Sequence, residues 1–482
     1  MGVPRATTAT PVLPWRSAQL TASANSKGQG DQLAWRRPED RSDSVVKRVR
    51  FARSTVGSAF ARAVMVLASG TAIAQLIALA ATPLATRLYG PDAFGVMGAF
   101  MAVVAVLAPV AALTYPTAIV VQPDDRRAVQ VAQLSIILAT ASAMLVAAFV
   151  VLGPFATWTA KLPGTVATGA LLLTTAVFFS VTRDVGLQWI IRKQQFGLMS
   201  KAAVIQATLV HGAKLLVGLV AATGGALITI VALGPLIHSA LLVAGARRDS
   251  RTWPSNAPAS RPSFSVLREA AVLNRDFPRF RAPHLLINRL SQSLPVIMLV
   301  SLFGSVEAGY FTAALTLMMA PVALLGKSVE DALYPRVAAM VQQARSPSAA
   351  IWRSTLVLAA VAFVPFAVLA VWSQSLFPLL LGREWTGAGT YASWLSFWIF
   401  FLLIGRPSIA AIAPLGLQGQ ALAISIASLI LRAAAILTGG LWLQSDVAAV
   451  ALFSLSSAIT NFLQIILVAR ASARVTSMRR DA

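Results

Sequence analysis

Four basic side chains lie inside long apolar runs of the sequence and are the first candidates for chemistry: Lys214, Arg289, Arg406 and Arg432. A lysine or arginine in the middle of a membrane helix costs on the order of 3 kcal/mol, so it usually faces a water-filled cavity. The same runs contain no acidic residue that could pair with these cations. The pattern therefore predicts a cationic cavity that binds an anionic substrate.

Each cation also has a simpler explanation. Arg289 lies about five residues inside its run, close enough for its long side chain to reach the cytoplasmic headgroups. Lys214 and Arg432 lie nearer the centres of their runs, where reaching the headgroups is harder. Arg406 precedes Pro407 at a helix break and could be interfacial.

Neutral polar residues accompany the cations. Thr71, Gln75, Thr82 and Thr86 recur at intervals that place them on one face of a helix. Threonine hydroxyls can bond back to their own helix, but the amide of Gln75 needs several partners. We predict as substrate-binding residues Arg289, Gln75, Asn288, Gln292, Lys214, Arg432, Thr71 and Thr82.

Two segments 214 residues apart share one pattern, in which Leu, an aromatic residue and Gly are followed by a second Gly five positions later. These segments are Leu88–Gly95 and Leu302–Gly309, and each lies between two apolar runs. The same shift aligns Gln75 with Arg289. Two copies of one helical unit, with a substrate path between them, are typical of transporters.

The composition places the chain in a bilayer, because 57% of its residues are hydrophobic, 12% are charged and the mean hydropathy is +0.72. Hydropathy indicates about twelve membrane spans. We predict an all-α polytopic membrane protein with two six-helix lobes related by the internal repeat. The spans lie near 64–86, 94–113, 128–153, 165–182, 202–222, 226–246, 284–302, 308–326, 350–372, 389–413, 420–442 and 447–469.

The basic residues set the orientation. Of the 40 Lys and Arg residues, 33 fall on one side of this span pattern and three on the other. The richer side is retained in the cytoplasm, so we expect both termini in the cytoplasm. The net charge of +23 is spread over these loops, which argues against nucleic acid as a partner and favours membrane lipids.

The span pattern divides the chain into five parts. The first is a basic arm rich in Ser, Thr, Pro and Arg, which we expect to be disordered. A basic linker with several prolines separates the two lobes. The parts are the arm 1–62, the N-lobe 63–246, the linker 247–283, the C-lobe 284–470 and the tail 471–482.

Residues for bond-making chemistry are scarce. There is no cysteine, no Gly-Lys-Ser or Gly-Lys-Thr phosphate loop, and no metal-ligand spacing among His211, His238 and His284. A polymerase that acts on a lipid-linked sugar needs an acidic base or an acidic pair on a sizeable outer loop. Each acid of the predicted outer side stands alone in a short loop. These acids are Asp92, Glu307, Glu384 and Asp446. We therefore predict no enzymatic activity, catalytic residue, metal or cofactor.

Several short motifs follow one another between about residue 60 and residue 470. They are Arg87–Gly95, Gln188–Phe196, Asp276–Pro278, Gln292–Pro295, Phe303–Tyr310, Tyr334–Arg336, and Gly382, Trp385, Ala388, Gly389 and Tyr391. In order and spacing these motifs resemble those of bacterial polysaccharide and lipopolysaccharide exporters, which are O-antigen-type flippases of the multidrug, oligosaccharidyl-lipid and polysaccharide exporter superfamily. The resemblance implies a two-lobed fold in the bacterial inner membrane, whose central cavity turns over an undecaprenyl-diphosphate-linked oligosaccharide.

Alternative functions stay open. A peptidoglycan-precursor flippase would share the cationic cavity, whereas a cation-coupled drug exporter would need an acid deep in the first lobe. A polysaccharide polymerase is disfavoured by the short outer loops. A flippase in this pathway would have as partners its lipid-linked substrate and the polymerase and chain-length proteins.

Overall fold

The apolar runs form a set of long helices. The computed structural model describes residues 69–152, 166–248 and 263–474, and every secondary-structure element in these ranges is helical. Eleven of the described helices are long and apolar enough to cross a membrane, so the protein is a multi-pass membrane protein. Helix α6 (Phe196–Gly218) has 23 residues but is less apolar, because polar and basic residues such as Gln206 and Lys214 interrupt it. With α6, the helices match the twelve predicted spans in order.

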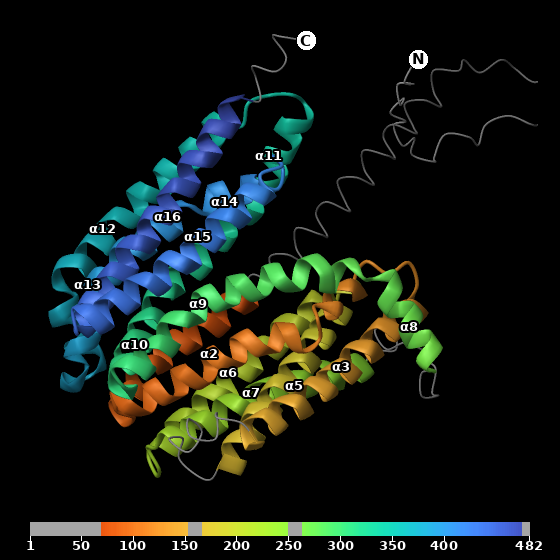
Figure 1. Ribbon diagram of the computed structural model, residues 1–482, viewed down its shortest axis with the longest axis horizontal. Coiled ribbons are helices and arrows are strands. Elements are labelled where there is room, and N and C mark those ends of the chain that lie inside the picture. The colour runs from red at the N-terminus through yellow and green to blue at the C-terminus, as the bar shows by residue number, and fades with distance from the viewer. Residues whose placement is uncertain (1–68, 153–165, 249–262, 475–482) are drawn as a thin grey trace, which may run out of the picture. The chain divides into compact units, whose positions relative to one another are not determined.

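The helices of the N-lobe gather into one group, coloured orange to yellow-green in Figure 1. Within this group α5 packs against α3 and α7, and α6 packs against α7. Its elements are the leading helix Ser69–Leu88, α2 (Pro91–Ala111), η1 (Tyr115–Ile119), α3 (Asp125–Leu152), α5 (Val166–Arg192), α6 and α7 (Gly224–Arg248).

The predicted linker 247–283 contains a helix that the sequence analysis missed. Helix α8 (Phe264–Leu273) packs against α3, and the π-helical turn η2 (Phe277–Arg281) leads directly into the C-lobe. Ala270 is buried together with Trp189 and Tyr115 of the N-lobe. The predicted arm 1–62 lies outside the described residues.

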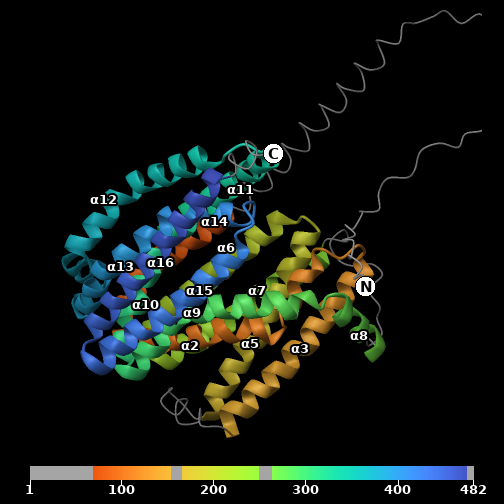
Figure 2. The ribbon, with the colours of Figure 1, turned by 45° about the horizontal axis from the view of Figure 1, so that its top comes forward.

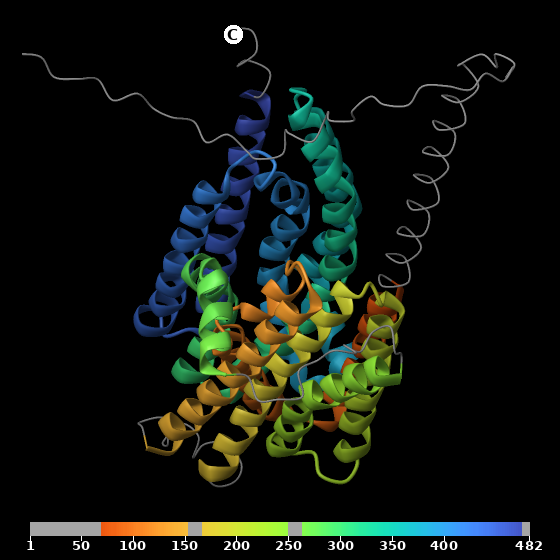
Figure 3. The same cartoon turned by 90° about the vertical axis from the view of Figure 1, so that its right-hand side faces the viewer.

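The helices of the C-lobe form a second group, coloured green to blue (Figure 1 and Figure 3). Helix α13 packs against α12 and α16, and α15 packs against α16. The elements are α9 (Ala282–Leu302), α10 (Ser305–Pro321), η3 (Val322–Gly326), α11 (Lys327–Gln342), α12 (Ser348–Leu381), η4 (Arg383–Trp385), α13 (Thr386–Ile404), α14 (Arg406–Ile412), α15 (Gln418–Leu437), η5 (Thr438–Trp442) and α16 (Asp446–Arg474).

The lobes meet where the two copies of the repeated motif end. Helix α2 packs against α10 and α9, and Figure 2 shows α9 running alongside α2. A Cβ atom on Gly95 would overlap the carbonyl oxygen of Ser305, and one on Gly309 would overlap that of Pro91. Because Ser305 is Pro91 shifted by 214, these contacts are reciprocal, as in a two-fold interface. We call this contact the glycine crossing.

Further contacts join the lobes beside the glycine crossing. The indole Nε1 of Trp385 donates a hydrogen bond to the carbonyl oxygen of Thr86 at 3.0 Å, and the Arg87 guanidinium donates one to the carbonyl of Leu379 at 2.9 Å. The hydroxyl of Ser305 donates to the Asp92 carboxylate. The end of the molecule that carries the repeated motif, the crossing end, is therefore held together by both packing and hydrogen bonds.

Candidate functional site

The polar stripe on the leading helix becomes more buried toward the crossing end. Thr82 and Thr86, nearer the crossing end, are buried, whereas Gln75 is half-buried. Gln75 has no hydrogen-bond partner among the described residues. The side chain of Gln75 is therefore available to a ligand.

Helix α9 repeats this arrangement with the same 214-residue shift. Arg289, which the shift aligns with Gln75, is exposed. Val296, which the shift aligns with Thr82, is buried in the main apolar core, to which both lobes contribute. Residues seven apart lie on nearly the same face of a helix, so Arg289 and Val296 share one stripe. On both leading helices the stripe is packed toward the crossing end and exposed farther away.

Three predicted binding residues come together on α9. Gln292 donates a hydrogen bond from Nε2 to Asn288 Oδ1 at 2.6 Å, one turn away, and Arg289 lies between them in the sequence. On the leading helix, Thr71 is exposed, while the hydroxyl of Thr82 donates to the carbonyl of Ala78 at 2.7 Å. Thr82 thus has the self-bonded conformation that its helical position allows.

Arg432 does not join this stripe, because its side chain lies inside the C-lobe and is only 8% exposed. Its Nη1 donates to Ser291 Oγ at 3.0 Å, on the opposite face of α9 from Arg289. The guanidinium lies 5.4 Å from the ring centre of Trp398 and 5.6 Å from that of Phe453. Arg432 therefore fixes α9 within its own lobe.

Lys214 lies inside the N-lobe, also apart from the stripe. Its Nζ is 3.8 Å from the sulfur of Met97, and its side chain lines a cavity between α2, α5, α6 and α7. The structure thus separates the three cations among the predicted binding residues into one exposed residue, Arg289, and one interior residue in each lobe, Lys214 and Arg432.

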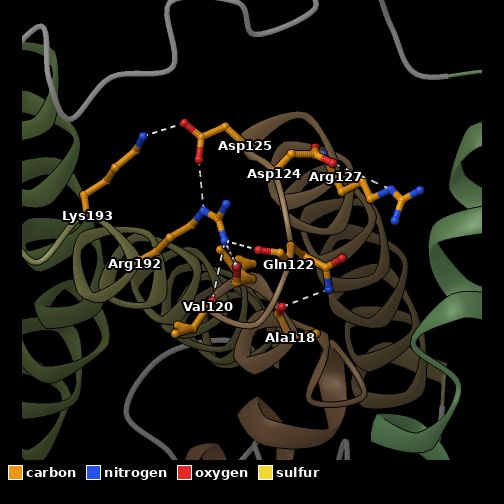
Figure 4. A network of polar contacts seen from close by, with 9 residues as sticks. Ala118, Val120, Gln122, Asp124, Asp125, Arg127, Arg192 and Lys193 are labelled. Carbon is orange, nitrogen blue, oxygen red and sulfur yellow. Dashed lines mark hydrogen bonds and ion pairs between the residues drawn. The ribbon is translucent and has the colours of Figure 1, made fainter. Parts of the chain in front are cut away.

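Arg192 anchors the inner loop of the N-lobe, on the predicted cytoplasmic side (Figure 4). It donates to the Asp125 carboxylate at 3.0 Å and to the carbonyl of Gln122 at 2.6 Å, and Lys193 pairs with the same carboxylate. The residue 214 positions later, Arg406, pairs with Glu330 at 2.8 Å. In both lobes, an arginine at or just beyond the end of the fourth long helix thus pairs with an acid from another segment.

The same loop also holds the segment that leads into α9. The hydroxyl of Tyr115 donates to the carbonyl of Ala271 at 3.2 Å, and the hydroxyl of Thr114 donates to that of Phe277 at 3.1 Å. Burial raises the pKa of Tyr115, which keeps the hydroxyl protonated as a donor. The start of α9 is therefore connected to the N-lobe through η1 and α8.

Within the described ranges, no group of three or more His, Asp or Glu side chains is placed to bind a metal ion. Along the two stripes, Gln75, Asn288 and Gln292 supply amides that form hydrogen bonds, and Arg289 supplies a cation. Such a set can bind an anion or a sugar.

Solved structures with a similar fold include two transporters and a flippase. An inward-facing multidrug resistance MATE family transporter of the MOP superfamily aligns with a TM-score of 0.66 and 14% identity over 84% of this chain and 96% of its own. The lipid II flippase MurJ, in an inward closed conformation, gives 0.65 and 9% over 86% and 90%. A MOP superfamily transporter from Pyrococcus furiosus Vc1 (DSM3638) gives 0.56 and 14% over 86% and 96%.

At the sequence level, a search of curated proteins found no match. The profile of the family described as polysaccharide biosynthesis protein matches residues 84–389, which is more than half of the chain. The matched range includes the glycine crossing, Lys214, α9 and the start of α13, and it ends before Arg432. The chain therefore belongs to the polysaccharide biosynthesis protein family, and it has the fold of the MOP-superfamily transporters.

Proposed function

We propose that this protein is a flippase that moves an undecaprenyl-diphosphate-linked oligosaccharide across the bacterial inner membrane for surface polysaccharide synthesis. The observation that carries the proposal is the matched pair of stripes, on which Gln75 and Arg289 occupy equivalent, accessible positions of the two leading helices. Membership of the polysaccharide biosynthesis protein family supports the choice of substrate.

The chemistry of the stripe residues fits such a substrate. The planar guanidinium of Arg289 can donate two parallel hydrogen bonds to a phosphate, which a lysine ammonium cannot do. The amides of Gln75, Asn288 and Gln292 both donate and accept, as sugar hydroxyls require. We assign the diphosphate to Arg289 and the first sugars to these amides. Thr71 serves as a further sugar contact.

The glycine crossing supplies a pivot for translocation. With the lobes joined at the crossing end, substrate enters between the leading helices from the opposite side. Rocking of the lobes about this contact then exposes the same residues to the other side of the membrane, with no covalent bond made or broken. We place the termini in the cytoplasm, so a reporter enzyme active only outside should be inactive when fused after residue 260 and active near 160 or 380.

A transport assay tests the function. Purified protein would be placed in liposomes with an undecaprenyl-diphosphate oligosaccharide that carries a fluorescent sugar, and flipping would be followed by a membrane-impermeant quencher. Parallel liposomes would contain lipid II or a cationic dye. Flipping of the oligosaccharide lipid alone is expected. Preference for lipid II would make the protein a peptidoglycan-precursor flippase, and transport of the dye would make it a drug exporter.

A further inference from the structure

A cavity of about 230 Å³ lies within the N-lobe, and no residue of the leading helix or of α9 lines it. Its walls come from α2, α5, α6 and α7, with Met101, Val210, Val231, Gly234 and Pro235 as its apolar part. A cavity of this size holds several water molecules or a small solute, but it is smaller than the usual pocket for a large organic ligand. The oligosaccharide lipid does not fit in it.

The polar part of the cavity is basic. Lys214, Arg183, His238 and Gln206 line it, and none of the described lining residues is acidic. Arg183 is paired with its neighbour Asp184 at 2.8 Å. Among the described residues Lys214 has no such counter-charge, and its Nζ lies 3.8 Å from the sulfur of Met97, which is a weak acceptor.

Two further groups point to a ligand. The Nε2 atom of His238 is buried and has no hydrogen-bond partner among the described residues. The amide nitrogen of Gln206 lies close to Gly234, at the wall of the same cavity. Buried polar atoms in proteins are almost always hydrogen-bonded, so an unpaired one beside a cavity calls for a partner inside it.

We propose that this cavity binds a small inorganic anion such as chloride, with Lys214 as the principal ligand. The anion offsets the positive charge that the interior of the lobe would otherwise hold without compensation. His238 donates to it in the Nε2–H form and Gln206 donates from its amide. A cation is disfavoured because Lys214 and Arg183 would repel it. The N-lobe thus carries its own ion site, separate from the substrate stripe.

Anion-dependent stability of the full-length protein in detergent tests the proposal. Thermal unfolding would be followed by tryptophan fluorescence in sodium gluconate, with chloride, bromide or phosphate titrated at constant ionic strength. Chloride and bromide are expected to raise the unfolding temperature with saturation. Lys214→Met should raise the half-saturating chloride concentration at least tenfold, and Lys214→Arg should largely retain binding. Phosphate saturation without a halide effect would identify a phosphate site and contradict the chloride assignment.

Matched variants separate this site from other effects. Lys201→Met removes an exposed lysine from the same helix and should leave the chloride titration unchanged. Arg289→Ala should also leave it unchanged, so failure of the transport proposal and failure of the anion site are distinguishable. A crystal grown in bromide should show anomalous density beside Lys214 Nζ. A titration that is identical in Lys214→Met and wild type, or bromide density elsewhere only, would overturn the proposal.

Discussion

The two lobes share a framework and differ in their interiors. A shift of 214 residues relates Gln75 to Arg289 on the leading helices and Gly95 to Gly309 in the glycine crossing. It also relates Arg192 to Arg406, the arginines that pair with an acid in each lobe. The N-lobe interior, however, contains a cavity lined by Lys214, whereas the interior cation of the C-lobe, Arg432, is packed against aromatic rings.

The comparison separates positions that packing requires to be alike in both copies from positions where the two copies differ. The glycines must repeat, because the two-fold contact needs a small residue on both sides. The leading helices need not repeat their side chains, and Gln75 in one copy stands where Arg289 stands in the other. In the proposed flippase, Arg289 then supplies a cation for the charged end of the substrate, and the neutral amides supply hydrogen bonds for its sugar chain.

The largest effect on stability is expected at the glycine crossing. Gly95→Ala or Gly309→Ala places a methyl group against backbone that cannot move as a side chain can, and should cost about 3 kcal/mol by separating the helices. Denaturation by SDS, followed by tryptophan fluorescence, measures this cost.

Gly212→Ala on α6 is the matched control, because no atom lies within 4 Å of the added methyl group. It should stabilise the protein by about 0.5 to 1 kcal/mol, since alanine is the better helix former. Equal effects of Gly95→Ala and Gly212→Ala would mean that the lobes do not meet at this crossing.

The ion pairs of Arg192 and Arg406 should differ in how much stability returns when the partner acid is also neutralised. Arg406→Ala leaves Glu330 without its partner and should cost about 2 kcal/mol, most of which Glu330→Gln should recover in the same chain. Arg192→Ala also removes donors from the carbonyls of Ile119 and Gln122, so Asp125→Asn should recover little. Double-mutant cycles measure both couplings. Equal recovery in the two lobes would contradict the assignment of Arg192 to the loop carbonyls.

The interior cations should give the smallest effects. Arg432→Met loses the bond to Ser291 and the ring contacts but leaves no acid unpaired, so it should cost about 1 kcal/mol. Lys214→Met in gluconate should cost nothing or stabilise slightly, because an uncompensated buried charge is removed. Thermal unfolding of both variants would check the order, and a larger loss from Lys214→Met would contradict it.

The sequence alone predicted much of the fold and less of the site. Length and hydropathy are enough to place most spans, and the Leu-aromatic-Gly motif indicated the internal repeat. The contact between the lobes at Gly95 and Gly309 was not predicted, because the motif alone does not reveal which backbones approach each other. The interior positions of Lys214 and Arg432 could not be predicted, because lipid and protein core are equally apolar and hydropathy does not reveal which face of α6 or α15 points inward.

Helix α8 was missed for a related reason. Its ten residues are too few for a membrane span, and it lies beside a proline-rich segment that indicates a linker. The spacing of Leu267, Ala270 and Ala271 is the signal that could have identified an amphipathic helix there.

Export by Arg289 variants tests the central claim most directly. In a strain deleted for the native gene, Arg289→Ala should abolish surface polysaccharide at normal protein abundance, and Arg289→Lys should restore part of it. Gln75→Ala should weaken export less, because a neutral hydrogen bond contributes about 1 kcal/mol against about 2 to 3 for a charged one. Arg281→Ala, which removes an exposed arginine just before α9, serves as the control and should export normally. Wild-type polysaccharide from Arg289→Ala would contradict the account and remove this residue from the substrate site.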